Sequence, residues 1–338
     1  MSKKSRIIIT GSAGFIGSAL VERALEDNFK ILGIDNHNDY YDPRLKDLRL
    51  NRFLNNKDYS HSKVSIEDRD SLFEIIDRFK PDTIVHLAAQ AGVRFSIENP
   101  ESYIQSNLVG FGNILEAARR NKTSHLVYAS SSSVYGASTQ MPFSVKNSSE
   151  HSISLYGATK KANEVMAHSY SYLYNIPTTG LRFFTVYGPW GRPDMALFKF
   201  AKAILNGESI EIYNNGNHKR DFTYIDDIID GILSVIKKGH IRDEEWKSDE
   251  PLNDSSIAPW RILNLGNGNP VKLTKFIELI EQNLEIEANK KYLPMQPGDV
   301  IETYADISET RKLYEYSPKV SVEVGISRFI DWYKTYQL

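Results

Sequence analysis

A tyrosine and a lysine lie four residues apart near the middle of the chain, at Tyr156 and Lys160. The apolar pattern of Tyr156–Tyr174 predicts a helix, so both side chains emerge on one face, one turn apart. A phenol with an ordinary pKa of about 10 is a poor base at neutral pH, but a neighbouring ammonium favours the phenolate. The pair therefore indicates a tyrosine that acts as a general base, although two surface residues of a helix would have the same spacing.

Four consecutive serines, Ser130–Ser133, precede this pair. They follow an apolar run, His125–Ser130, that predicts a buried strand. Open α/β sheets bind ligands at the carboxyl ends of their strands. We therefore expect these hydroxyls to lie in a binding site close to Tyr156, with a turn that satisfies its own backbone as the alternative.

Three glycines, Gly11, Gly14 and Gly17, follow the first predicted strand and open a helix. There, backbone N–H groups and the positive helix terminus can face a pyrophosphate, although the spacing is not the usual G-x-G-x-x-G. Asp35 ends the second strand, 24 positions after Gly11, close to the offset of ~20 at which an acid binds the adenosine ribose. Because this carboxylate would repel a 2′-phosphate, we predict NAD rather than NADP. A tightly packed turn, with Asp35 as a helix cap, is the alternative.

The composition excludes several classes of site and partner. The 338 residues are 41% hydrophobic and 25% charged, as in a soluble globular chain of one or two domains. No cysteine is present and the 8 histidines are scattered, so we predict no disulfide, thiolate nucleophile or metal site. A net charge of −2 favours neither nucleic acid nor an anionic membrane. With no signal sequence or membrane span in the pattern, we expect a cytoplasmic protein.

The elements that position these residues alternate in the first half of the chain. Short β-branched runs alternate with amphipathic helical patterns, which predicts an α/β fold with a Rossmann-type doubly wound parallel sheet. The strands are expected at Arg6–Thr10, Lys30–Asp35, Lys63–Ile66, Thr83–Leu87, His125–Ser130 and Thr178–Arg182. The helices are expected at Gly14–Glu26, Arg69–Phe79, Pro100–Arg120 and Tyr156–Tyr174.

Beyond Arg182 the regularity weakens, and a smaller C-terminal α/β lobe is expected to bind the substrate. We assign residues 1–182 to the NAD-binding domain, rejoined by parts of 222–266, and residues 183–338 to the lobe. The polar stretch Gly239–Pro259 lacks periodicity and is interpreted as a solvated insertion. Later helices are expected at Met195–Leu205, Ile225–Lys237, Leu273–Asn283 and Val322–Tyr336.

Motifs extend over nearly the whole chain. They are TGSAGFIG at Thr10–Gly17, HLAAQAG at His86–Gly92, SSSSVYG at Ser130–Gly136, YGATK at Tyr156–Lys160, LRFFTVYGPWGRPDMALF at Leu181–Phe198 and KRDFTYIDDI at Lys219–Ile228. Together they resemble the extended short-chain dehydrogenase/reductase family of nucleotide-sugar epimerases and dehydratases. DNHNDYYDPRLKDLRL at Asp35–Leu50, AGVRFS at Ala91–Ser96 and the SSIAPWRILNLGN run are most similar to the 4-epimerases of UDP-glucuronate.

The resemblance implies a reaction in which NAD stays bound and no net oxidation occurs. Tyr156, held as phenolate by Lys160, would take the proton of the sugar 4-hydroxyl directly or through Ser131 while the C4 hydride moves to the nicotinamide. The 4-keto sugar would turn over and receive the hydride on its other face. The implied conversion is UDP-glucuronate to UDP-galacturonate.

The resemblance also implies two sets of binding residues. The cofactor set is Gly11, Gly14, Phe15, Ile16, Gly17, Asp35, Ala88, Ala89, Gln90, Asn107 and Lys160. Arg192 and Arg220 match positions that contact the substrate diphosphate, although a surface ion pair would explain either arginine. The other substrate residues are Ser132, Ser133, Thr185, Asp299 and, more weakly, Arg94.

The residues after Ser131 discriminate among related reactions. Related 4,6-dehydratases have an Asp-Glu pair there and uronate decarboxylases a Glu at the second position, whereas this chain has Ser132 and Ser133. Hydroxyls cannot supply a carboxyl acid or base, so epimerisation is favoured. Ser132, Ser133 and Thr185 would hold the uronate carboxylate away from the orientation that favours loss of carbon dioxide. A 4-epimerase of UDP-glucose or UDP-N-acetylglucosamine, a dehydratase or decarboxylase, and a non-catalytic NAD-binding sensor are the alternatives.

Two departures from the family pattern concern binding. Many relatives have an adenine-contacting Asp near the end of the third strand, where this chain has Ser65-Ile66. Gln296-Pro297-Gly298-Asp299 stands where relatives that act on neutral sugars often have an R-x-G-D segment. The resemblance further implies a homodimer in which Pro100–Arg120 and Tyr156–Tyr174 form a four-helix bundle with their symmetry mates.

Overall fold

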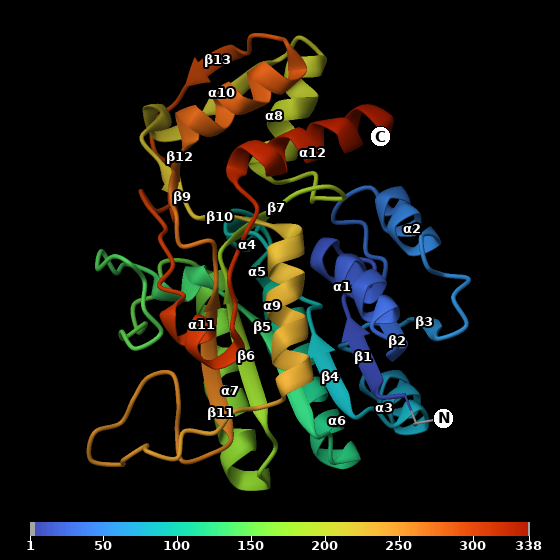
Figure 1. The fold of residues 1–338 in the computed structure, drawn as a ribbon. Coiled ribbons are helices and arrows are strands. Elements are labelled where there is room, and N and C mark those ends of the chain that lie inside the picture. The colour runs from blue at the N-terminus through green and yellow to red at the C-terminus, as the bar shows by residue number, and fades with distance from the viewer. Residues whose placement is uncertain (1–3, 337–338) are drawn as a thin grey trace.

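A seven-stranded parallel sheet forms the centre of the molecule in the computed structural model, which describes residues 4–336 (Figure 1). The strand order is β11-β6-β5-β4-β1-β2-β3, and every neighbouring pair is parallel. The predicted doubly wound parallel sheet is therefore confirmed. The strands are β1 (Arg6–Thr10), β2 (Lys30–Asp35), β3 (Tyr59–Lys63), β4 (Thr83–His86), β5 (His125–Ser131), β6 (Thr178–Phe183) and β11 (Trp260–Leu265).

Helices cover both faces of the sheet because its strands are apolar on both sides. In β1, Ile7 and Ile9 belong to the hydrophobic cluster on the side of α1 (Phe15–Glu26) and α9 (Ile225–Lys238). Ile8, which points the other way, belongs to the opposite cluster. That cluster contains residues of α3 (Arg69–Phe79), α6 (Phe111–Asn121) and α7 (Leu155–Tyr174).

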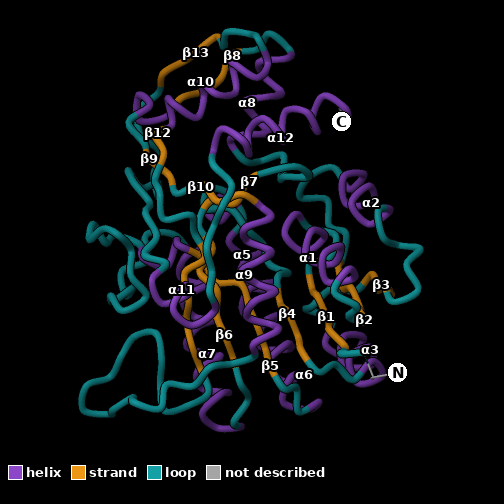
Figure 2. Tube along the Cα trace, viewed as in Figure 1, coloured by secondary structure: helices purple, strands orange, loops and turns teal. Residues whose placement is uncertain are grey.

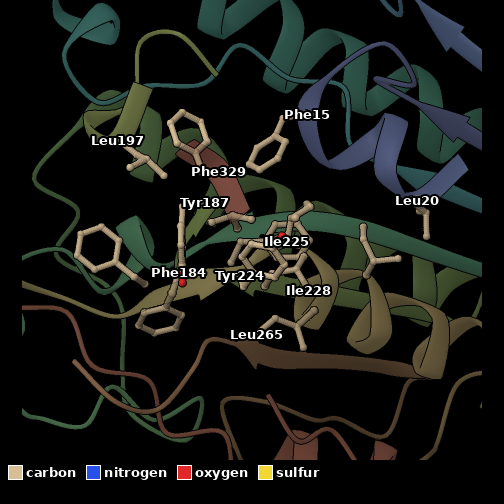
Figure 3. Packing of buried hydrophobic residues seen from close by; sticks show 14 of the residues in the cluster. Phe15, Leu20, Phe184, Tyr187, Leu197, Tyr224, Ile225, Ile228, Leu265 and Phe329 are labelled. Carbon is tan, nitrogen blue, oxygen red and sulfur yellow. The ribbon is translucent and has the colours of Figure 1, made fainter. Parts of the chain in front are cut away.

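The C-terminal lobe lies over the carboxyl ends of the strands (Figure 1). Figure 3 shows Phe329 of α12 packed near Tyr187 and Leu197, and the cluster continues to Ile225 and Leu265 beside the sheet. One core therefore joins the lobe to the sheet. The lobe and its connections contain β7 (Thr185–Tyr187), α8 (Ala196–Leu205), β8 (Ser209–Ile212), η3 (Tyr213–Gly216), β9 (Lys219–Arg220), β10 (Phe222–Tyr224), β12 (Val271–Lys272), α10 (Leu273–Leu284), β13 (Asn289–Tyr292), α11 (Ser308–Tyr314) and α12 (Val322–Thr335).

The predicted helix Pro100–Arg120 is three consecutive helical pieces. They are α5 (Pro100–Tyr103), a π-helical stretch η1 (Ile104–Gly110) and α6. A Cβ at Gly110 would lie 2.6 Å from the Ile66 side chain, so this glycine allows η1 to approach the segment after β3. Short helices also occur at α2 (Pro43–Asn51), α4 (Phe95–Glu98) and η2 (Ser132–Tyr135).

Two expectations need correction. The third strand is Tyr59–Lys63 rather than Lys63–Ile66, because the polar edge strand ends where the apolar Val64–Ile66 run begins. The 239–259 stretch has no helix or strand and forms the long loop in Figure 2, but it is not solvated throughout. Asp254, Ser255 and Ser256 are buried, and the Ser256 hydroxyl bonds to the His168 ring. Between residues 4 and 336, no helix combines the length and apolarity that a bilayer span requires.

Candidate active site

A cavity of about 1030 Å³ lies at the carboxyl ends of the strands, with the C-terminal lobe forming one side. This is the edge at which an open α/β sheet binds its ligands. Nearly all residues predicted for the site line it: Gly11, Gly14, Phe15, Ile16, Gly17, Asp35, Ala88, Ala89, Gln90, Arg94, Ser131, Ser132, Ser133, Tyr156, Lys160, Thr185, Arg192, Arg220 and Asp299. Asn107 does not line it.

The glycine loop combines tight packing with an anion-binding helix end. A Cβ at Gly11, whose φ is +71°, would lie 2.8 Å from the Ala88 nitrogen, and one at Gly17 would lie 2.0 Å from the Gly11 carbonyl oxygen. These two glycines thus allow close packing. Gly14 is the N-cap of α1 and no side chain caps that helix, so its first-turn N–H groups can bind a pyrophosphate.

Asp35 is buried at the end of β2 and accepts hydrogen bonds from the Ala13 N–H (3.1 Å) and the His37 N–H (2.9 Å). It caps no helix, since α2 is capped by Asp42. The Lys46 ammonium lies 3.8 Å from the Asp35 carboxylate and also lines the cavity. Burial lowers the pKa of Lys46, while Asp35 opposes that shift. Sequence reasoning missed Lys46, although the N-cap and the proline at the start of α2 mark its helix.

Glu67 supplies a carboxylate two residues beyond Ser65, where the family acid is absent. It lines the cavity beside Val64 and Ile66. Its two oxygens accept hydrogen bonds from the Ser65 and Ser106 hydroxyls. Glu67 is therefore a carboxylate of the cavity wall that the family pattern alone did not indicate.

Asn107 is buried and is not among the residues that line the cavity, so its contact with the cofactor stays a prediction. Its Oδ1 accepts from the Gln90 N–H (2.9 Å). Its Nδ2 donates to the Gln90 carbonyl (3.0 Å) and the Thr159 hydroxyl (3.1 Å). Because both polar atoms are used, Asn107 holds the main chain of the lining residue Gln90.

Tyr156, Ser131 and Lys160 line the same cavity. Tyr156 is in the first turn of α7, which Ser154 caps through the Gly157 N–H (3.1 Å), and Ser131 ends β5. Burial raises the pKa of Tyr156, while a hydrogen bond with Ser131 and the Arg192 charge act against that shift. Lys160 is buried and donates to the Ala129 carbonyl (3.1 Å), and burial lowers its pKa to about 8. Its effect on Tyr156 stays a prediction.

Arg192 is held in the cavity by residues that the sequence did not single out. Its Nε donates to Asp194 Oδ1 (3.0 Å), and the Tyr40 hydroxyl donates to Asp194 Oδ2 (3.2 Å). Burial acts to lower the pKa of Arg192, but Asp194 outweighs it and raises the pKa above its usual value. Burial and Asp194 raise the pKa of Tyr40 to about 12. Arg192 therefore stays protonated and is paired with Asp194 at the cavity wall.

Asp299 lies between two arginines from opposite sides of the cavity. Arg220 of β9 donates to one carboxylate oxygen at 2.8 Å, and Arg94, which precedes α4, lies 4.0 Å from the other. The Arg94 guanidinium also lies 4.7 Å from the centre of the Tyr213 ring. Arg94 and Arg220, two of the three predicted arginines, thus lie near the same carboxylate.

The serine segment presents hydroxyls to the cavity. Ser131 accepts from the Ser133 N–H (3.1 Å) and so starts the short helix η2. Ser132, Ser133 and Thr185 are partly exposed and line the cavity. Neither of the positions after Ser131 offers a carboxylate.

Comparisons with known proteins place the chain in one family. The model of the NAD dependent epimerase/dehydratase family matches residues 7–245. Protein CapI of Staphylococcus aureus is 51% identical, with 98% of this chain and 99% of that protein covered. A probable UDP-glucuronate 4-epimerase of Rhizobium meliloti is 45% identical over 97% and 96%. UDP-glucuronic acid 4-epimerase from Bacillus cereus, solved with UDP-glucuronic acid and NAD, is 30% identical with a TM-score of 0.85, covering 98% and 99%.

The match extends well beyond half of the chain, and the glycine loop, Asp35 and Tyr156 line one cavity at the expected edge of the sheet. The chain belongs to the NAD-dependent epimerase/dehydratase family.

Proposed function

We propose that the protein interconverts UDP-glucuronate and UDP-galacturonate by NAD-dependent epimerisation at C4 of the sugar. One observation carries the proposal: Tyr156 and Ser131 line a single cavity with the glycine loop, while the positions after Ser131 offer hydroxyls instead of carboxylates. This arrangement supports proton removal from an alcohol and leaves elimination and decarboxylation without an acid or base there. The relatives and the solved structure with UDP-glucuronic acid support the same substrate.

The glycine loop, Asp35 and Glu67 fit the pyrophosphate and the adenosine end of a dinucleotide, since an uncapped helix terminus suits the pyrophosphate and carboxylates suit ribose and adenine. NAD, when bound, accepts the C4 hydride and returns it. Lys160, which lines the same cavity as Tyr156, is assigned to the nicotinamide ribose and to holding Tyr156 as phenolate. Its pKa of about 8 leaves it mostly protonated at neutral pH.

Tyr156 is assigned as the general base. Because burial raises its pKa, the phenol is a weaker acid than usual and less of the phenolate base is present at neutral pH, so groups that lower the pKa favour the active form. Ser131 lines the same cavity as Tyr156 and is assigned to pass the proton from the sugar 4-hydroxyl to it. The returning proton would use the same pair in the reverse direction after the keto sugar has turned over.

Positioning of the uronate carboxylate is assigned to Ser132, Ser133 and Thr185. Oxidation at C4 creates a β-keto acid. Such an acid loses carbon dioxide easily when the bond from C5 to the carboxylate carbon is perpendicular to the plane of the C4 carbonyl. Hydroxyl donors fix the orientation of the carboxylate, which the chemistry needs more than tight binding. Arg192 and Arg220 are assigned to the diphosphate, where a guanidinium fork can face its oxygens.

The test is incubation of the NAD-loaded protein with UDP-glucuronate, followed by NMR of the sugar. UDP-galacturonate is the expected product. A pentose product would mean decarboxylation, and unchanged substrate together with turnover of UDP-glucose would assign a different UDP-sugar. Either result overturns the proposed substrate reaction.

We also propose a homodimer formed through α7 and the α5–η1–α6 helix. Apolar side chains are exposed on both: Ile104 (39%) and Val109 (45%) on η1, and Val165 (61%) on α7. Because the two helices contact each other, their exposed faces form one surface that a second copy can cover. A cytoplasmic location stays a prediction.

A further inference from the structure

A buried cation lies beside the cavity without a carboxylate partner among its hydrogen bonds in residues 4–336. Arg49 of α2 has an exposed fraction of 0%. Its guanidinium donates to the carbonyl oxygens of Trp190 (2.7 and 3.0 Å), Gly191 (3.0 Å) and Ala13 (3.1 Å), and to the Tyr41 hydroxyl (2.6 Å). Burying an arginine against neutral acceptors is costly, so its contacts call for an explanation.

The acceptors of Arg49 belong to the two sides of the cavity. Ala13 is in the glycine loop between Gly11 and Gly14, whereas Trp190 and Gly191 directly precede Arg192. The Nη1 group of Arg49 bonds to the loop assigned to the cofactor, and its Nε and Nη2 groups bond to the loop that carries Arg192. One guanidinium therefore fixes the distance between the two loops.

The Arg192 loop needs such support because its backbone is strained. Trp190 has a φ of +63°, a conformation unfavourable for a bulky residue. This conformation directs two consecutive carbonyls to Arg49. The Trp190 ring also contacts Arg52, the C-cap of α2, at 4.9 Å, and Trp332 of α12, at 5.2 Å between ring centres.

The segment that carries Arg49 also holds the other side of Arg192. Tyr40, between β2 and α2, donates to Asp194, which in turn accepts from Arg192. The direction of the Arg192 side chain is thus set by Asp194 and Tyr40, and the position of its backbone by Arg49.

We propose that Arg49 is a positioning residue. By bonding to both the glycine loop and the loop of Arg192, it fixes the position in which Arg192 can bind the diphosphate of the nucleotide sugar. The inference rests on the diphosphate role given to Arg192 under the proposed function. A lysine in place of Arg49 keeps the charge but has a single ammonium in place of the fork, so it cannot reach both loops with the same geometry.

The test measures UDP binding to the NAD-loaded protein by calorimetry, for Arg49→Lys, Arg192→Met and the double variant. Each single substitution is expected to weaken UDP binding about tenfold, the loss of one charge-assisted contact. If Arg49 acts through Arg192, the double variant binds UDP within about twofold of Arg192→Met. A matched control is Arg44→Lys, because Arg44 is exposed on the same helix and bonds to Asp42. It should leave UDP affinity unchanged.

Two results overturn the proposal: wild-type UDP affinity in Arg49→Lys, or a double variant that loses the product of the two single factors, as a general structural defect would. NAD content and thermal unfolding are measured in parallel. If Arg49→Lys does not fold, Tyr41→Phe replaces it, because this change removes only one acceptor of Arg49. Tyr41→Phe must then weaken UDP binding when it is introduced into the wild-type protein, and must not weaken it further when it is introduced into Arg192→Met. Product formation from UDP-glucuronate is a separate readout, so a failure here leaves the epimerase proposal standing.

Discussion

A buried ion pair beneath the serine segment offers a sharp test of how the site is held. Glu164 of α7 and Arg182 of β6 are 2% and 0% exposed. Arg182 donates to Glu164 through Nε and Nη2, both at 2.8 Å, and the Ser130 hydroxyl donates to the same carboxylate at 2.7 Å. The pair therefore joins α7, the helix of Tyr156, to β6, and the Ser130 hydroxyl joins the same carboxylate to β5, the strand that ends at Ser131.

Glu164→Gln leaves the Arg182 guanidinium buried without an opposing charge. Breaking a buried pair in this way costs about 3–5 kcal/mol, a large share of a typical unfolding free energy of about 5–15 kcal/mol. Urea unfolding at neutral pH should show this loss. Glu150→Gln is the control, because Glu150 is 65% exposed and lies 3.7 Å from Lys161; we expect a change below about 1 kcal/mol.

The double variant Glu164→Gln with Arg182→Met removes both charges. Its destabilisation should be smaller than the sum of the two single changes, since neither charge is left unpaired. A loss below about 1 kcal/mol in Glu164→Gln, or full additivity in the double variant, would refute the reasoning that this pair holds the two elements together.

Three further predictions concern acid stability, product partition and assembly. Burial lowers the pKa of His86 to about 3 and that of His125 to about 4, so the unfolded chain binds more protons below its histidine pKa of ~6.5. Stability should fall as pH drops from ~6.5 towards ~4, by up to about 3 kcal/mol per pH unit; flat urea midpoints over that range would contradict this. Thr185→Val should raise the share of decarboxylated product roughly tenfold, as expected for one lost hydrogen bond to a charged group, and NMR showing an unchanged partition would remove Thr185 from this role. Val165→Glu should convert the dimer to a monomer by light scattering, whereas an intact dimer would exclude the α7 surface.

The sequence predicts the central elements well because their signals are local. β1, β2 and the start of α7 follow from apolar periodicity, and the glycine loop and the Tyr156–Lys160 pair lie in the context that their chemistry requires. The third strand was predicted at the wrong residues because its local signal is weak. Its Tyr59–Lys63 segment is a polar edge strand with a weak pattern, and the apolar run that suggested a strand lies beyond it.

The parts of the site that the sequence missed depend on long-range contacts. The Trp190 carbonyl oxygen that accepts from Arg49 lies 141 residues away in the sequence. No local pattern near Arg49 predicts this contact. Asn107 lies in a π-helical stretch that apolar periodicity cannot distinguish from an ordinary helix, and its bonds to Gln90 and Thr159 join residues far apart in the sequence. Lys46 could have been found, since Asp42 and Pro43 mark the start of its helix.

The central claim is that the Tyr156 hydroxyl removes the proton from the sugar 4-hydroxyl beside bound NAD. The most direct measurement is turnover of UDP-glucuronate by Tyr156→Phe, followed by NMR, with NAD content and UDP affinity measured on the same sample. We expect NAD content and UDP affinity to match the wild type while galacturonate formation is lost. A near-normal rate of galacturonate formation in this variant would contradict the account.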